Sequence, residues 1–334
     1  MPSSFRCYLV TKNAANEVSA SAAQRPMSDL PAGDVLIRVA YSSLNYKDAL
    51  AAKGHPGVVR AFPHVPGIDA AGTVEESRAA AFRPGQQVLV TGYELGSGAW
   101  GGFAEYVRVP ERWVVPLPNG LSLRESMIYG TAGFTAALSL DALLRHGITP
   151  GDGEIVVTGA SGGVGSIAVA LLAKAGFQVA AVSGKPAAEE FLRSLGAASV
   201  LPRSDVQDNS NKPLLGARWA GAVDTVGGNT LATLLRATRR GGCVTACGLV
   251  GGAELSLTVY PFILRGVTLA GIDSAECPMP KRLELWKHLA SNWKPPTLET
   301  IARETVALEG LPEQIERILR GETMGRVLVS LGDG

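Results

Sequence analysis

Cysteine is scarce in this chain of 334 residues, and its positions share no metal-binding pattern. The four cysteines, Cys7, Cys243, Cys247 and Cys277, contain no C-x-x-C pair. Structural zinc lobes and disulfide-stapled small domains both use closely spaced cysteines, so neither is expected here. We expect no bound metal and reduced thiols, as in a cytoplasmic protein.

An excess of charge of one sign is also lacking. Lys and Arg number 31 against 30 Asp and Glu, and the two signs are interspersed. This excludes a basic surface for nucleic acid or an anionic membrane, so we expect a small-molecule partner. The longest uncharged stretch, 155–173, has the length of a membrane span but contains a glycine-rich loop, and no signal peptide is evident.

Glycine is abundant, and the most informative glycines stand in IVVTGASGGVG, residues 155–165. A short apolar run precedes them, and Gly176 and a second apolar run, 177–182, follow. Between them lies one apolar stripe at helical spacing, formed by Val164, Ile167, Ala168, Leu171, Leu172 and Ala175. The pattern predicts a strand, a helix and a parallel strand, and therefore a doubly wound parallel sheet of the Rossmann type.

The loop itself has the properties of a pyrophosphate site. Gly162 lets backbone approach a phosphate, Gly165 lets the helix lie close to its strand, and the helix N-terminus attracts an anion. We expect Ser161, Gly162, Gly163 and Val164 to contact a dinucleotide. The first glycine of G-x-G-x-x-G is Ala160 here, so the match to that pattern is imperfect.

Two other interpretations fit the same letters. Residues 159–163 also match the G-x-S-x-G nucleophile elbow of serine hydrolases, with Asp224 or Asp273 and His288 as partners, but this leaves Gly165 unexplained. The loop also resembles that of short-chain dehydrogenases, whose Tyr-x-x-x-Lys pair should follow it. The only such spacing, Tyr8 to Lys12, lies far upstream.

The end of the second strand indicates which dinucleotide binds. An NAD enzyme places Asp or Glu there to hold the ribose 2′-hydroxyl, whereas this chain has Ser183, Gly184 and Lys185. A hydroxyl and an ammonium favour a 2′-phosphate. The sequence therefore predicts NADPH.

Two domains are expected along the chain. Short strands at 5–10, 35–41, 87–91 and 103–109, separated by Pro/Gly turns, predict a β-rich, barrel-like N-terminal domain. A Pro-rich boundary at 116–120 and a capping box at 122–125 begin the second domain. Alternating helices and strands extend it to about 272, and the last segment returns to the first domain. We expect a catalytic domain of 1–122 completed by 296–334, and a Rossmann domain of 123–295.

Several motifs together resemble the medium-chain dehydrogenase/reductase superfamily. They are SSLNYKD at 42–48, GIDAAG at 67–72, GTAGFTA at 130–136, the 158–165 loop, DTVG at 224–227 and PFILR at 261–265. Within the superfamily they resemble the YhdH-type quinone oxidoreductases, which include NADPH-dependent acryloyl-CoA reductases. The resemblance covers essentially the whole chain and implies a GroES-like first domain.

The resemblance also implies a reaction. The zinc ligands of alcohol dehydrogenases are missing, because no cysteine stands near Asn45 and the Gly-His-Glu motif reads Gly67-Ile68-Asp69. Hydride transfer to a conjugated C=C needs no metal, so the chemistry indicates reduction of an enoyl-CoA, with a quinone as the alternative substrate. Tyr46 is the implied proton donor or cofactor positioner, and Asn45 is a candidate ligand of the substrate carbonyl.

Further residues are implied in binding. The additional cofactor contacts are Tyr46, Thr135, Arg203, Leu249, Ile272 and Arg326. Lys53, Arg60 and Arg265 are cations available to the phosphates of CoA. The apolar stretch 255–272 resembles the family's edge strands and predicts a homodimer. A non-catalytic NADPH sensor stays open as an alternative.

Overall fold

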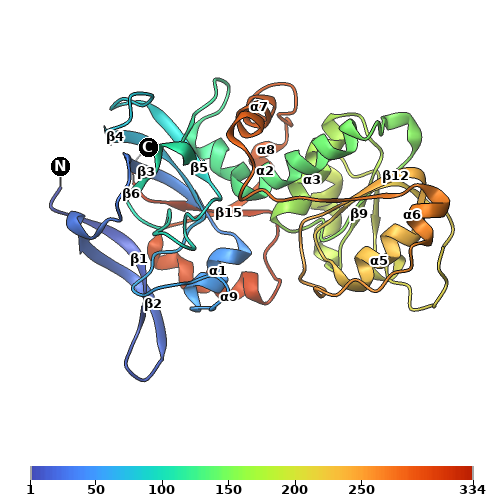
Figure 1. Ribbon diagram of the computed structural model, residues 1–334, viewed down its shortest axis with the longest axis horizontal. Coiled ribbons are helices and arrows are strands. Elements are labelled where there is room, and N and C mark those ends of the chain that lie inside the picture. The colour runs from blue at the N-terminus through green and yellow to red at the C-terminus, as the bar shows by residue number, and fades with distance from the viewer. Residues whose placement is uncertain (1, 333–334) are drawn as a thin grey trace. The chain divides into compact units, whose positions relative to one another are not determined.

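The computed structural model describes residues 2–332 and divides the chain into two compact units (Figure 1). Unit 1 consists of Met1–Thr131, Ala275–Ala290 and Ala302–Gly334, and unit 2 of Ala132–Ser274 and Ser291–Ile301. The division differs from the expected boundaries after 122 and 295. The first crossing falls inside a helix, and a further segment returns to unit 1.

Unit 1 is built on a seven-stranded sheet, in which β14, β15, β3, β4, β5 and β7 are neighbours in that order and β6 pairs with β3. β1 and β2 form a separate hairpin, which makes isolated bridges to Ala104 and His64 outside the named strands. The strands are β1 (Ser4–Lys12), β2 (Val18–Pro26), β3 (Val35–Ser43), β4 (Asp69–Ser77), β5 (Gln87–Thr91), β6 (Tyr106–Val109), β7 (Val115–Pro116), β14 (Ala302–Val306) and β15 (Arg326–Ser330).

Helices of unit 1 cover this sheet's core. They are α1 (Tyr46–Ala52), α7 (Met279–Leu289) and α9 (Leu311–Leu319), with α1 and α9 packed together. Helix α7 belongs to unit 1 because its Arg282 guanidinium is buried, donates to the Thr91 carbonyl at 2.8 Å and lies 4.4 Å from the Tyr93 ring centre. These contacts hold α7 to unit 1, whereas the sequence predicted that this segment belongs to the Rossmann domain.

Unit 2 contains a six-stranded parallel sheet in the order β10-β9-β8-β11-β12-β13. Because the chain moves one way from β8 to β9 and the other way from β11 to β12, right-handed crossovers place α3 and α5 on opposite faces. The strands are β8 (Ile155–Val157), β9 (Val179–Val182), β10 (Ser199–Leu201), β11 (Trp219–Asp224), β12 (Thr238–Ala246) and β13 (Thr268–Gly271). The helices are α3 (Gly163–Lys174), α4 (Glu189–Ser194), α5 (Gly228–Ala237), α6 (Tyr260–Arg265) and α8 (Leu298–Ile301). This is the predicted doubly wound Rossmann arrangement.

Helix α2 (Leu123–Arg145) runs from unit 1 into unit 2 and is broken at Gly130, where φ is 49° and ψ is −155°. Its first turn has the predicted capping box, in which Ser122 and Glu125 exchange side-chain bonds at 2.9 and 3.1 Å. The helix is long and apolar enough to cross a membrane, but 83% of its most apolar window is buried inside the protein. Its apolar character is accounted for by core packing.

Candidate cofactor site and active site

The glycine loop of unit 2 has a backbone that only glycine can supply at two positions. Gly159 has a φ of 56°, and a Cβ there would lie 2.3 Å from Thr225 Oγ1. A Cβ on Gly165 would lie 2.3 Å from the Gly159 carbonyl oxygen, so the start of α3 packs directly on the turn. The tight turn expected of the motif's first glycine is thus made by Gly159, one residue before Ala160.

The start of α3 leaves backbone N–H groups available for an anion. Gly162 is the N-cap, and the first helical bond runs from the Ser166 N–H to the Gly162 carbonyl at 2.9 Å. The N–H groups of Gly163, Val164 and Gly165 precede that bond and, with the helix dipole, attract phosphate. The residues present fit a pyrophosphate.

The loop lies where the strand order reverses, between β8 and β11. Thr158 Oγ1 donates to Asp224 Oδ1 at 2.6 Å, and the Gly227 N–H donates to Asp224 Oδ2 at 2.7 Å. Burial raises the pKa of Asp224, while these bonds oppose the shift. Asp224 therefore joins the two halves of the sheet at the switch point, a role that the DTVG letters alone did not disclose.

The residues expected at the 2′-phosphate come together at the ends of β9 and β10. Ser183 Oγ lies 3.2 Å from Ser161 Oγ and accepts the Lys185 N–H at 3.1 Å. Arg203 lies against the backbone of Gly184, where a Cβ would come within 2.4 Å of the Arg203 Nε. The Ser183 hydroxyl thus lies beside the glycine loop, the Arg203 guanidinium lies against Gly184, and no carboxylate stands at 183–185, the place typical of NAD enzymes.

The other expected cofactor residues of unit 2 are less closely grouped. Leu249 follows β12 and is 67% exposed, and Ile272 follows β13 with its N–H bonded to the Ala246 carbonyl. Both stand at carboxyl ends of parallel strands, where ligands bind in this sheet type. Thr135 is buried in α2. Their contacts with a cofactor stay predictions.

In unit 1, Tyr46 is the first residue of α1 and is 44% exposed, with Asn45 as the N-cap. Asp48, at the third helical position, accepts the Asn45 N–H at 2.8 Å, which is half of a capping box. Sequence reasoning found the polar cluster but not the helix. An S/T/D/N-x-x-D pattern ahead of alanines was the signal that could have found it.

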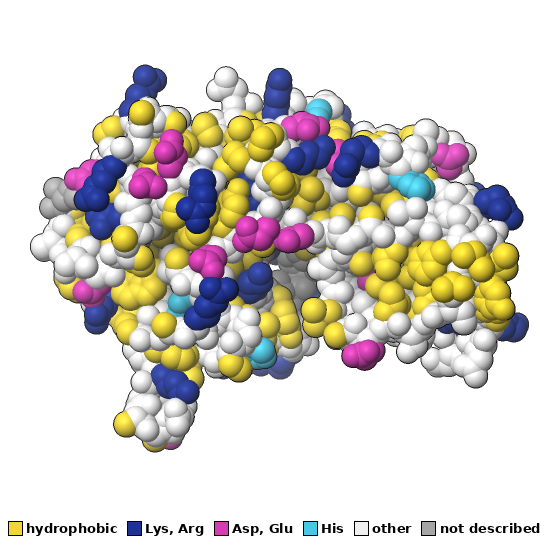
Figure 2. All heavy atoms as spheres, in the orientation of Figure 1, with side chains coloured by type: hydrophobic (Ala, Val, Ile, Leu, Met, Phe, Trp, Pro, Cys, Tyr) yellow, Lys and Arg dark blue, Asp and Glu magenta, His cyan; other side chains and the backbone are white. Residues whose placement is uncertain are grey.

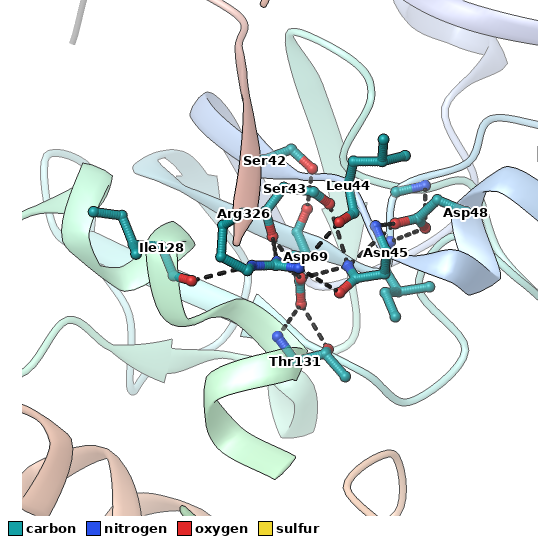
Figure 3. A network of polar contacts seen from close by, with 11 residues as sticks. Ser42, Ser43, Leu44, Asn45, Asp48, Asp69, Ile128, Thr131 and Arg326 are labelled. Carbon is teal, nitrogen blue, oxygen red and sulfur yellow. Dashed lines mark hydrogen bonds and ion pairs between the residues drawn. The ribbon is translucent and has the colours of Figure 1, made fainter. Parts of the chain in front are cut away.

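A buried network of polar side chains lies under Asn45 (Figure 3). Asp69 Oδ2 accepts from Ser43 Oγ and Asn45 Nδ2, both at 2.7 Å, and its Oδ1 accepts from the Thr131 N–H at 2.8 Å. Arg326, 3% exposed, lies 3.6 Å from Asp69 Oδ2. Asp69 thus binds side chains and backbone of three separate chain segments.

Arg326 uses its guanidinium inside unit 1. Its Nε donates to the Ile128 carbonyl at 3.1 Å, its Nη1 to Leu44 O and Asn45 Oδ1, and its Nη2 to Ser43 Oγ at 2.6 Å. Burial lowers the pKa of Arg326, and the nearby carboxylates oppose that shift. The predicted contact of Arg326 with cofactor stays a prediction beside this structural role.

Asp48 is the second buried carboxylate of the network. Its Oδ1 accepts the N–H groups of Gly67 and Ile68 at 3.1 and 2.8 Å, and its Oδ2 faces the Asn45 amide at 3.1 Å. Burial, with the Asp69 charge, raises the pKa of Asp48 to about 7, although its hydrogen bonds act in the opposite direction.

A catalytic zinc does not fit this donor set. At the positions expected to carry zinc ligands in alcohol dehydrogenases, this chain has Asn45 and Ile68. The Asn45 amide already donates to Asp69, and Ile68 is apolar. Across residues 2–332, no three His, Cys, Asp or Glu side chains are grouped to hold a metal ion.

The three cations considered for the phosphates of CoA already have partners. Lys53 pairs with Glu316, Arg60 pairs with Glu94, and Arg265 donates to backbone carbonyls.

The geometry does not support a nucleophile elbow at Ser161. An elbow serine sits in a sharp, strained turn. Among the described non-glycine residues, only Asn16 and Tyr93 have a positive φ. Ser161 is buried and pairs with Ser183, and Asp224 is engaged by Thr158 and Gly227.

A Rossmann sheet with a phosphate loop at its switch point, together with a second unit built on a β-sheet, defines a dinucleotide-binding oxidoreductase. Residues 31–119 match the alcohol dehydrogenase GroES-like domain, and residues 163–289 match the zinc-binding dehydrogenase family. The chain belongs to the medium-chain dehydrogenase/reductase superfamily, in its YhdH-type group.

Three relatives are similar over nearly their whole length. The chain is 45% identical to acrylyl-CoA reductase AcuI of Ruegeria pomeroyi, covering 98% of this chain and 99% of AcuI. It is 49% identical to the "Putative quinone oxidoreductase YhfP" of Bacillus subtilis, covering 99% and 100%; a structure of YhfP has NAD bound and a TM-score of 0.96. The yhdH oxidoreductase of Salmonella enterica, solved with NADP, is 48% identical with a TM-score of 0.94, covering 98% and 100%.

Proposed function

We propose that this protein is an NADPH-dependent reductase of an activated C=C bond, with acrylyl-CoA or a related 2-enoyl-CoA as its substrate. The observation that carries the proposal is the cluster of Ser183, Lys185 and Arg203 beside a pyrophosphate loop, in a chain closely similar to an acrylyl-CoA reductase. We also propose that it acts in the cytoplasm, where its four scattered cysteines would stay reduced.

Unit 2 would hold the dinucleotide. The N–H groups at the start of α3 would bind the pyrophosphate, and Ser183, Lys185 and Arg203 the 2′-phosphate. Bound NADPH supplies a hydride for the β-carbon of the substrate. The remaining task is to accept charge on the thioester oxygen and to return a proton to the α-carbon.

Tyr46 is the residue of unit 1 suited to that task. Its phenol is half-exposed at the start of α1, and a phenol can donate a proton to an enolate carbon or a hydrogen bond to a cofactor. Both roles require the hydroxyl to be held in one place. The carbon that accepts the proton carries negative charge delocalised into the thioester, so no metal is needed for this step.

The test is NADPH oxidation followed in parallel with acrylyl-CoA, crotonyl-CoA and a small quinone. We expect turnover with an enoyl-CoA to exceed that with quinone at equal concentration. Activity with quinone but with no enoyl-CoA would establish the second candidate, a quinone reductase, which the name of YhfP favours. Tight NADPH binding without turnover of any of the three would indicate a sensor.

We further propose a homodimer formed through unit 2. Strand β13 ends the sheet, and among described residues it pairs only with β12. The segment that leads into β13 carries an apolar patch, formed by the exposed residues Leu255, Val259, Tyr260, Ile263 and Leu264. Figure 2 shows hydrophobic side chains gathered on this side of unit 2. An open strand edge flanked by apolar residues is self-complementary about a two-fold axis.

A further inference from the structure

The position of Tyr46 depends on the first turn of a very short helix. Helix α1 has seven residues, and isolated helices of this length are unstable because nucleation is costly. The groups that hold its N-terminus therefore decide how well the phenol is placed. Asn45 is the residue at that point.

The Asn45 side chain fits its surroundings in one orientation only. Its Nδ2 lies 3.1 Å from Asp48 Oδ2 and 2.7 Å from Asp69 Oδ2, and its Oδ1 lies 3.2 Å from Arg326 Nη1. The reversed amide would set an oxygen against two carboxylates and an NH₂ against a guanidinium. Asn45 is thus the neutral link between two buried acids and one buried base (Figure 3).

The groups around Asn45 are anchored to other segments. Asp48 holds the backbone ahead of β4 through Gly67 and Ile68, and Asp69 holds the broken helix α2 through Thr131. The Asn45 amide itself bonds to β3, β4 and β15, through Ser43, Asp69 and Arg326. Both amide hydrogens and the amide oxygen already have partners within unit 1.

We propose that Asn45 is a positioning residue, which fixes Tyr46 by clamping the start of α1 between Asp48, Asp69 and Arg326, and is not the ligand of the substrate carbonyl. The catalytic consequence rests on the proposed reductase function, in which Tyr46 contacts substrate or cofactor. The physical consequence for Tyr46 does not depend on that function.

The kinetic test is a double-mutant cycle of Asn45→Ser and Tyr46→Phe, with kcat for acrylyl-CoA and the NADPH dissociation constant measured for each variant. Serine is as good an N-cap as asparagine, so α1 stays capped while the link to both carboxylates is lost. We expect Asn45→Ser to lower kcat by roughly tenfold to a hundredfold, as for a misplaced catalytic group. In the Tyr46→Phe background it should lower kcat little further, because it acts through Tyr46.

A second measurement reports on Tyr46 without turnover. With 3,5-difluorotyrosine at position 46, the wild type should give one sharp ¹⁹F resonance, and Asn45→Ser should give a broadened or divided one. Ser122→Ala, which removes the side-chain cap of α2 elsewhere in unit 1, should leave the resonance sharp. This control separates clamping of Tyr46 from a general loss of stability.

Two results would overturn the proposal: losses of kcat that multiply in the double variant, or a resonance that stays sharp in Asn45→Ser. The reductase function fails separately, if the wild type turns over no enoyl-CoA. In that case the ¹⁹F measurement alone decides whether Asn45 positions Tyr46.

Discussion

A single hydroxyl stands where the cofactor's 2′ group is expected. Ser183 accepts the Lys185 N–H and donates its hydroxyl to Ser161 Oγ of the glycine loop, so a turn of the hydroxyl alone would direct it to a phosphate oxygen. We expect NADPH to bind at least about tenfold tighter than NADH, a difference of ~1.4 kcal/mol. Ser183→Asp should reverse this preference, since a carboxylate repels the 2′-phosphate and accepts from a 2′-hydroxyl.

Titration of each dinucleotide by fluorescence checks this expectation. Ser19→Asp, an exposed serine on β2, controls for the added charge. Equal dissociation constants for the wild type would contradict the assignment of the 2′-phosphate site.

Tyr46 allows a residue-scale test of the chemistry. If its phenol donates the proton, Tyr46→Phe should lower kcat by about 10²- to 10⁴-fold while NADPH affinity changes little. If it positions cofactor, the affinity should fall together with kcat. Tyr41→Phe, at a partly exposed tyrosine of β3 outside the apolar patch, is the control. An unchanged kcat in Tyr46→Phe would leave solvent as the proton source.

At the scale of elements, the break in α2 ties this helix to the buried network. A Cβ at Gly130 would lie 2.5 Å from Asp69 Oδ2 and 2.6 Å from Ser43 Oγ, whereas a Cβ at Gly147, with φ of 88°, would meet nothing within 4 Å. Gly147→Ala should cost about 1–2 kcal/mol through its backbone alone. Gly130→Ala should cost a further ~1–3 kcal/mol from the clash.

Urea denaturation of both variants measures this difference. Equal midpoints would mean that the network yields easily around the new methyl group.

The cap of α1 should make stability depend on pH. The pKa of Asp48 is about 7 in the folded protein and has its ordinary, lower value in the unfolded chain. At a pH between these two pKa values, the Asp48 carboxyl is protonated in the folded state and ionised in the unfolded state. The contribution of Asp48 to the free energy of unfolding is therefore present at low pH and falls as the pH rises towards 7.

The measurement is the free energy of unfolding of the wild type and of Asp48→Asn, from pH of about 4.5 to about 7.5. The wild type should lose stability relative to the variant as the pH rises. Asp152 should behave in the opposite way, because hydrogen bonds from Thr149 lower its pKa in the folded protein. Its contribution to stability is therefore lost as the pH falls. A wild-type advantage that grew between pH 5 and 7 would contradict the direction assigned to Asp48.

Elements in which apolar residues recur at a regular spacing were predicted well. The stripe from Val164 to Leu172 is helical in α3, with Ala175 as the C-cap, and Gln87–Thr91 is a strand with the predicted bounds. The short helix α1 was missed because its seven residues carry too little periodicity. Strand β2 was missed because its alanines and serines give no apolar alternation. The break in α2 lies at Gly130, which packs against Asp69 and Ser43, and no pattern near Gly130 reveals these distant partners.

The predicted site follows the same rule. Residues on one local motif, Ser161 to Val164 and Ser183 to Lys185, lie together as the motif requires. The partners of Arg326 come from three distant segments, at residues 43–45, Asp69 and Ile128, and no pattern near Arg326 reveals them. Such a network cannot be predicted from local sequence, because its residues come together only when distant strands pair in the folded sheet.

At the scale of the whole molecule, the apolar patch should control assembly. We expect a dimer by light scattering at micromolar concentration, and a monomer for Ile263→Asp, because the 67% exposed Ile263 would place a charge in the interface. Leu144→Asp, at an exposed apolar residue outside the patch, should stay dimeric. A monomeric wild type would exclude this mode of assembly.

The packing of Arg203 on Gly184 has a consequence for how cofactor preference could change during evolution. A Cβ at position 184 would lie 2.4 Å from the Arg203 Nε, so any side chain there displaces the flexible end of Arg203. An acidic side chain at this position would also attract the displaced guanidinium and compete with a 2′-phosphate for it. The two positions should therefore be epistatic, because the residue at 184 decides where the Arg203 guanidinium lies and whether it stays available to the cofactor.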